Sequence, residues 1–178
     1  MRGPGFASAA RPAFPMRLTA PALFLILVVA AGRVPAAQTS TATLNASINS
    51  VARLTLSSAA LTFPDADPDT VPNIQASQGP ITVTAKARTS PNGTVTLTVR
   101  ATDQLRSGLN TIPASSVTWV ATGGGFSGGT LSETTAQTAA TWTGSGVRTG
   151  TQTFFFRNLW SYATGTYTLT ITYTLSAA

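Results

Sequence analysis

The 178-residue chain contains neither cysteine nor histidine. The first absence excludes disulfides and thiolate nucleophiles, and the second removes the side chain that most often acts as a general base. A Ser-His or Cys-His nucleophile arrangement is therefore excluded as well. Only five acidic residues are present, and two of them, Asp103 and Glu133, stand apart in the sequence. Glycoside hydrolysis needs two carboxyl groups across a cleft, and no pattern places these two together. We therefore predict that the protein is not an enzyme.

Charged residues are also scarce, at 9% of the chain, and the formal charge of +6 is unevenly distributed. Seven basic and five acidic residues follow Gln38, whereas only basic residues precede it. Nucleic-acid binding requires a clustered basic surface. Because most of the excess charge lies in a segment that we expect to be removed, we predict no nucleic-acid partner. The basic residues before Gln38 are Arg2, Arg11, Arg17 and Arg33.

The first 37 residues have the features of a secretory signal peptide. Arg17 supplies a positive flank, and the stretch 19–31 that follows is apolar. Small residues then permit cleavage after Ala36 or Ala37. We therefore expect residues 1–37 to be removed during secretion.

The apolar stretch of this leader is shorter than the roughly 20 residues that a helix needs to cross a bilayer. We therefore expect contact with a membrane only through the leader, before cleavage. The mature protein is predicted to be secreted, with a periplasmic, cell-surface or extracellular location. Residues 38–178 are expected to form one domain. Met16 is a candidate for the true start, because residues 1–15 resemble no part of a signal peptide.

Residues 38–178 are rich in threonine and show strand periodicity without helical periodicity. The segments 81–88 and 94–101 alternate on either side of the turn signal at 90–93, which predicts a hairpin. Many short strands separated by turn residues predict an all-β fold, specifically an antiparallel immunoglobulin-like or pilin-like β-sandwich. The clearest strand is 165–176. Threonines on one of its faces alternate with an apolar face made of Tyr167, Leu169, Ile171, Tyr173 and Leu175.

A family resemblance rests on four segments. The opening strands 42–48 and 61–64, the strand 81–85 and the ending 165–173, with its Gly-x-Tyr start, together resemble the secreted pilin-like β-sandwiches, particularly the spore coat protein U type. Surface domains of the WxL type end in a similar way, and residues 119–121 are similar to part of their tryptophan motif. The resemblance implies a non-enzymatic, secreted structural or adhesive role, in fibres or surface layers, with no catalytic residues.

A candidate partner strand lies at residues 38–48, where Leu44, Ala46 and Ile48 share one face. In pilin-type sandwiches one strand is missing, and the N-terminal extension of a neighbour fills the groove by strand addition. The core strand 167–175 ends the sequence given, so no later strand is expected to complete the fold. Two hypotheses stay open: the segment is donated to another copy or a related surface subunit, or it folds back onto its own domain.

Asp65, Asp67 and Asp69 alternate in a proline-bounded loop. Alternating acids can surround a hard cation such as calcium. The EF-hand pattern is not met, because Thr70 stands where glycine is required and Ala76 where the closing glutamate is required. We therefore expect an acidic turn, with these three residues as candidates for weak calcium binding at most. No other cofactor is predicted.

Aromatic residues provide an alternative function. Trp142, Trp160 and Tyr162 lie near predicted strand ends, where their rings could stack on sugars in a carbohydrate-binding module. The competing interpretation is core or edge packing, which is expected for Trp119 from the apolar residues around it. The consecutive phenylalanines 154–156 place at least one ring on the face opposite the others. That strand is therefore covered on both sides, or it offers a ring at a contact surface.

Overall fold

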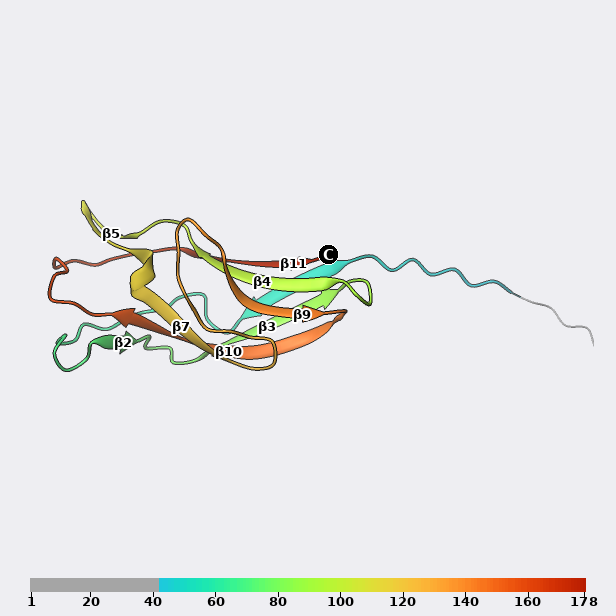
Figure 1. Cartoon of the computed structure of the whole chain (residues 1–178), viewed down its shortest axis with the longest axis horizontal. Helices are drawn as coiled ribbons and strands as arrows, with labels where there is room; N and C mark the ends of the chain where they lie inside the picture. The colour runs from blue at the N-terminus through green and yellow to red at the C-terminus, as the bar shows by residue number, and fades with distance from the viewer. Residues whose placement is uncertain (1–41) are drawn as a thin grey trace, which may run out of the picture. The chain divides into compact units, whose positions relative to one another are not determined.

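A computed structural model describes residues 42–178, so the predicted leader lies outside the described residues. These residues form an antiparallel β-sandwich (Figure 1). Within the same range there is no helix long and apolar enough to cross a membrane. The elements are β1 (Val51–Leu56), β2 (Asn73–Gln75), β3 (Ile81–Arg88), β4 (Thr94–Ala101), β5 (Leu105–Ser107), β6 (Asn110–Ile112), the 3₁₀ helix η1 (Ala114–Ser116), β7 (Val117–Thr122), β8 (Gly129–Thr130), β9 (Gln137–Thr143), β10 (Gly146–Arg157) and β11 (Ile171–Ala177).

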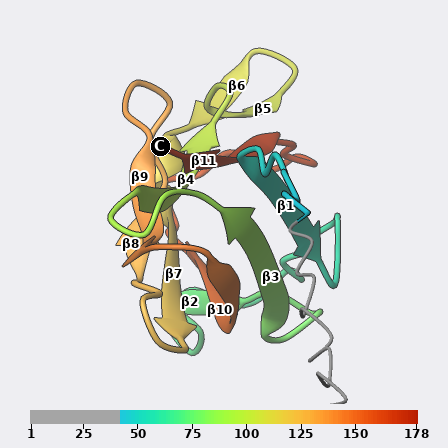
Figure 2. The ribbon, with the colours of Figure 1, turned by 90° about the vertical axis from the view of Figure 1, so that its right-hand side faces the viewer.

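Two sheets form the layers of the sandwich (Figure 2). The larger sheet has the order β1-β3-β10-β7-β8, with β2 also pairing with β10. The smaller has the order β11-β4-β9, and β5 and β6 form a separate ribbon. The inward-facing side chains of both sheets meet in a core that excludes water, and its burial is the main favourable term in folding. The largest fully buried apolar members are Trp119, Phe154, Leu97, Ile112 and Leu131.

The predicted hairpin between 81–88 and 94–101 is wrong, although both segments are strands. β3 pairs with β1 and β10, whereas β4 pairs with β11 and β9. The turn at 90–93 is therefore an arch that carries the chain from one sheet to the other. Each strand buries alternate residues, such as Val83 and Leu97. That alternation is the same whether two strands pair in one sheet or face each other across a core.

The alternation predicted for 165–176 is kept in the burial of the side chains, but the strand itself, β11, begins only at Ile171, and 165–170 contain no strand beyond an isolated bridge at Thr168. The pairing of β11 with β4 places Tyr173 opposite Val99 and Ala177 opposite Val95. The threonines are exposed and the apolar side chains face inward, but the latter are only half-buried. The reason is the position of β11 at the edge of the smaller sheet, where one flank has no neighbouring strand among the described residues.

The expected strand at 44–48 is absent. Residues 42–50 have no regular secondary structure and are exposed, including Leu44 at 94% and Ile48 at 72%. β1, and not this segment, pairs with the edge of β3. Over the described residues 42–48, the structure therefore gives no support to the hypothesis that the segment folds back onto its own domain.

Candidate functional site: an open seam and an end groove

One side of the sandwich is closed by hydrogen bonds between the sheets. The loop after β7 runs beside β9, where the Thr141 N–H donates to the Gly125 carbonyl at 3.0 Å. The Ser127 N–H donates to the Ala139 carbonyl at 2.9 Å. The indole N–H of Trp119 also donates to the Ser127 carbonyl, at 2.9 Å. Backbone groups on this side are therefore paired, and the core behind them is covered.

The opposite side of the sandwich is an open seam between β1 and β11. These are the outer strands of their sheets, and no backbone hydrogen bond joins them within residues 42–178. They lie against each other, but the segments 59–63 and 167–171 beyond them separate around a groove of about 370 Å³. Phe154, a core residue with no exposed surface, contributes to the wall of this groove. The groove therefore lies directly over the hydrophobic core, and Phe154 is one layer beneath its surface.

This seam groove continues into a larger end groove of about 1010 Å³. The end groove lies between the loop 61–68 and the loop 158–167. Aromatic rings form one continuous wall, in which the ring centroids of Phe63 and Phe156, and those of Phe156 and Tyr162, are 5.8 Å apart. Four residues line both grooves: Leu61, Phe63, Leu105 and Tyr167.

The three aromatic residues singled out in the sequence have different positions. Trp160 and Tyr162 line the end groove. Trp160 is 70% exposed, and its indole N–H donates to Asp69 Oδ1 at 3.0 Å. Tyr162 is half-buried, with its hydroxyl 2.9 Å from Ser116 Oγ. Trp142 packs in the core, so its prediction as a stacking residue is wrong. Its place on the inward face of β9 explains the burial.

The acidic residues form a turn at the rim of the end groove. Asp65 and Asp67 line it, and Asp69 follows in the same loop. Asp67 Oδ1 accepts the backbone N–H of Asp69 at 2.9 Å, which is an Asx-turn. The Asp67 carbonyl accepts the N–H of Val71 at 2.8 Å. Over residues 42–178 no three potential ligand side chains gather as a metal site. The calcium hypothesis thus gains no support, and the loop is the acidic turn.

One residue that sequence reasoning missed, Asn158, joins the two walls of the end groove. Its side-chain amide donates to the Ala66 carbonyl at 2.9 Å and to the Val71 carbonyl at 3.2 Å. Its backbone N–H donates to the Pro72 carbonyl at 2.8 Å. No pattern in the sequence marks this asparagine. The run of three phenylalanines gave no signal for the groove: the ring on the opposite face is Phe155, whereas Phe156 shares the face of Phe154 and lies on the groove wall.

A polar pair inside the sandwich was also missed. Gln152, on β10, has no exposed surface, and its Oε1 accepts the hydroxyl of Tyr173 at 2.6 Å. The Gln152 Nε2 has no hydrogen-bond partner among the described residues. Burial raises the pKa of the Tyr173 hydroxyl well above its ordinary value. The pair thus connects the central strand of one sheet to the seam strand of the other.

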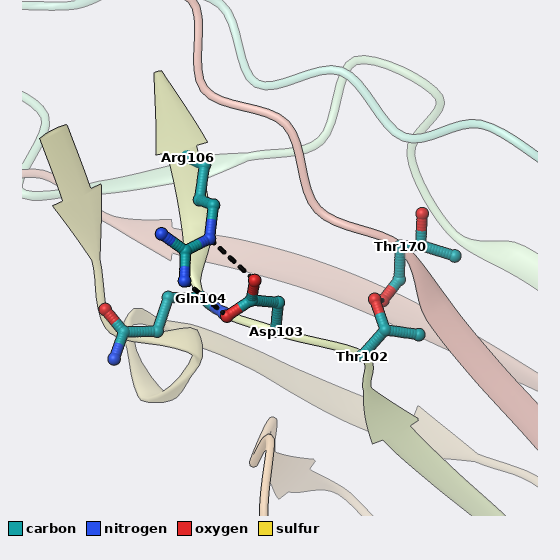
Figure 3. Close-up of polar contacts among 5 residues, drawn as sticks. All are labelled: Thr102, Asp103, Gln104, Arg106 and Thr170. Carbon is teal, nitrogen blue, oxygen red and sulfur yellow. Dashed lines mark hydrogen bonds and ion pairs between the residues drawn. The ribbon is translucent and has the colours of Figure 1, made fainter. Parts of the chain in front are cut away.

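The two isolated acids do not lie on either groove. Asp103 pairs with Arg106, with Asp103 Oδ2 2.6 Å from Arg106 Nε (Figure 3). The hydrogen bond from Arg106, followed by one from the Gln104 N–H, lowers the pKa of the Asp103 carboxyl. Both charges are exposed, so this pair contributes little to stability. Glu133 lies apart from the grooves, and no pair of acids faces across either one.

Comparison with known proteins gives no assignment: no protein-family model matches the chain, and a search of curated proteins finds no match.

Proposed function

We propose that the protein is a secreted, non-enzymatic structural or adhesive subunit that assembles by β-strand addition. Its partners are copies of itself or related surface subunits. In strand addition, an extended segment pairs with a free sheet edge and places alternate side chains in pockets. The observation that carries the proposal is that one chain combines an exposed segment of alternating sequence with an open seam that lies over the core.

The donor in this proposal is the segment 42–50. Leu44 and Ile48 are both exposed, and the alternation of the sequence would place them on one face with Ala46 if the segment became a strand. Covering an aliphatic side chain of this size is worth roughly 1.5–3 kcal/mol. Association that removes these two exposed side chains from water is therefore favourable.

The acceptor is the seam between β1 and β11 and its continuation at 167–171. The apolar residues Ile171 and Leu175 are only half-buried there, because no strand covers them. A free edge also presents unpaired backbone groups to an incoming strand. A donated segment would satisfy those groups and complete the cover over the core.

The ends of the sandwich give the assembly a direction. The chain enters β1 at Val51, opposite Arg88 and close to the arch at 90–93. β10 begins near the same arch, opposite Ala87. The end groove lies where β10 ends, beside Phe156. A segment that leaves at one end and is received at the other forms a head-to-tail contact, which produces a filament unless the rotation closes a ring.

The direct test is the mass of the chain from residue 38, measured by light scattering across concentrations. We expect multimers, and we expect a chain without residues 38–48 to be monomeric while still binding the longer form as an acceptor. The matched control keeps the length but replaces Leu44→Ser and Ile48→Ser, and it should behave like the shortened chain. A longer chain that is monomeric at high concentration and does not bind the shortened form would exclude strand addition.

Carbohydrate binding is the second candidate, favoured by the exposed indole of Trp160 on the rim of an aromatic groove. On this proposal, Trp160→Ala abolishes glycan binding and leaves the fold intact. Val147→Ala is the matched control, because Val147 is an exposed apolar residue on β10 near the arch. No binding across a broad glycan array would count against this candidate.

A further inference from the structure

The charges of the sandwich are segregated along its length. Among the described residues, Asp103 and Arg106 neutralise each other as an ion pair. Arg100 donates from Nε and Nη2 to the backbone carbonyl of Glu133, which places a cation beside that acidic residue. The remaining charges lie mostly at the two ends of β10.

One cluster, the basic end, lies beside the arch at 90–93. Arg53 stands directly opposite Lys86 in the pairing of β1 with β3, and Arg88 is two residues further along β3. Arg148 lies on the neighbouring strand, opposite the inward-facing Ala85, so it is at the same end of the sheet but on the other face from Lys86. All four are exposed, and none has an acidic partner within residues 42–178. Like charges directly across two strands are destabilising, so the folded subunit alone gains nothing from this arrangement.

The other cluster, the acidic rim, lies at the far end. It consists of Asp65, Asp67 and Asp69 beside the end groove. Two cations lie toward that end: Arg157, at the last position of β10, and Arg106, which is paired with Asp103. The wall next to the rim holds the exposed ring of Trp160, which Asp69 fixes through the indole N–H. A fixed indole face beside carboxylates suits a cationic side chain.

The two clusters are too far apart to stabilise each other within one molecule. β10 runs from one to the other over 12 residues. At a rise of about 3.3 Å per residue, that strand spans roughly 36 Å. The Debye length is about 8 Å at physiological ionic strength. Attraction between them therefore acts only between molecules.

We propose that the basic end of one copy docks on the acidic rim and end groove of the next copy. This inference rests on the proposed function and specifies how two subunits meet: the end from which the segment 42–50 leaves is the end that docks. Complementary charges of this kind accelerate encounter and fix orientation more than they add affinity. The charges orient the two copies, and Leu44 and Ile48 of one copy then cover the seam of the next.

Neutralising the acidic rim without disturbing its turn tests the proposal. Asn replaces Asp65, Asp67 and Asp69 in one variant, because an amide oxygen still accepts the hydrogen bonds from the Asp69 N–H and the Trp160 indole. A second variant carries Lys86→Gln and Arg88→Gln at the basic end. The control is Glu133→Gln, which changes a charge that belongs to neither cluster and lines neither groove. Association of the secreted chain is followed by stopped-flow light scattering at about 20 mM and about 300 mM salt, on either side of physiological screening.

We expect wild type to associate about tenfold faster at low salt than at high salt, and both neutralised variants to lose that dependence. The control should behave as wild type. Neutralised variants that associate like wild type at low salt would overturn the docking proposal. So would an association rate of wild type that does not change with salt.

The chain without residues 38–48 separates this proposal from strand addition. Salt-dependent encounter that persists in the shortened chain supports docking even if strand addition fails. Association that needs the segment but ignores salt supports strand addition and excludes docking. Absence of salt-dependent encounter in both chains excludes docking, whatever their final mass.

Discussion

Gln152 is the residue whose environment departs furthest from that of a typical core. Its side chain has no exposed surface, and its amide oxygen accepts the Tyr173 hydroxyl at 2.6 Å. Its amide nitrogen has no partner among the described residues. The hydrogen bond to Tyr173 is therefore important for stability. An unpaired buried polar group lowers the free energy of unfolding by more than a typical hydrogen bond raises it.

Removing the Tyr173 hydroxyl should therefore destabilise the sandwich. Tyr173→Phe leaves both ends of the Gln152 amide unpaired, at an expected cost of about 1–3 kcal/mol in the free energy of unfolding. The double variant Tyr173→Phe with Gln152→Leu should recover much of that loss, because no unpaired amide then stays buried at this position. Urea denaturation of the three chains measures the effect, and a neutral Tyr173→Phe would contradict the structure at this point.

The same hydroxyl gives a pH dependence in the alkaline range. Burial raises the pKa of Tyr173 in the folded protein above the ordinary value of 10.0. The unfolded chain then loses the proton more readily, so the stabilising contribution is complete below pH 10 and declines above it. As the pH rises above 10, the free energy of unfolding should therefore fall more steeply in wild type than in Tyr173→Phe. Parallel curves would contradict the assignment.

Residue roles were only partly predictable from the sequence. The alternation around Trp119 predicted a core position, and the structure confirms it at 2% exposure. Trp142 and Trp160 could not be distinguished by their neighbours, although one is in the core and the other is on the groove rim. The difference comes from tertiary position: Trp142 faces inward on β9, whereas Trp160 follows the end of β10.

Among the elements, β10 carries the most structural constraints, because it pairs with β2, β3 and β7. Its inward face changes from Gly150 to Gln152 to Phe154 along the strand. The glycine has a packing reason, since a Cβ there would lie 2.6 Å from the ring of Phe126 and 2.5 Å from the Thr122 carbonyl. The close approach of the loop after β7 thus requires the smallest residue at this position.

Gly150→Ala should consequently destabilise the protein by about 1–3 kcal/mol, the usual cost of overpacking. Gly146→Ala is the matched control on the same strand, because an added Cβ there meets no atom within 4 Å. Thermal unfolding of both variants gives the comparison. Equal melting temperatures for the two would show that Phe126 does not pack against β10 as described.

The strands themselves followed from period-two alternation, but their partners did not. The segments 81–88 and 94–101 were correctly predicted as strands, yet the arch between them was expected to be a hairpin. A buried face specifies that a strand covers a core and does not specify which sheet it joins. The segment 42–50 is the reverse case, since its alternation predicted a strand and it is exposed without one.

At the scale of the whole sandwich, one side is closed by hydrogen bonds and the other is open. Hydrogen bonds from the loop after β7 to β9 close one side, whereas β1 and β11 leave the other open. The β-sandwich could be predicted from the sequence, because alternating strands without helices are compatible with few other folds. The two grooves could not be predicted from the sequence. Their walls come from the loops 59–68 and 158–166, which have no periodicity, and from the alternating stretch 167–171; these segments meet only through tertiary contacts such as those of Asn158.

The central claim is that the seam accepts the segment 42–50 of another chain. A synthetic peptide of these residues, titrated into the chain lacking residues 38–48 and followed by amide NMR shifts, tests it most directly. We predict saturable binding that shifts the amide resonances of β11, β1 and the stretch 167–171. A peptide with Leu44→Ser and Ile48→Ser should bind at least about a hundredfold more weakly. Binding that ignores the serine replacements, or no shifts along the seam, would contradict the account.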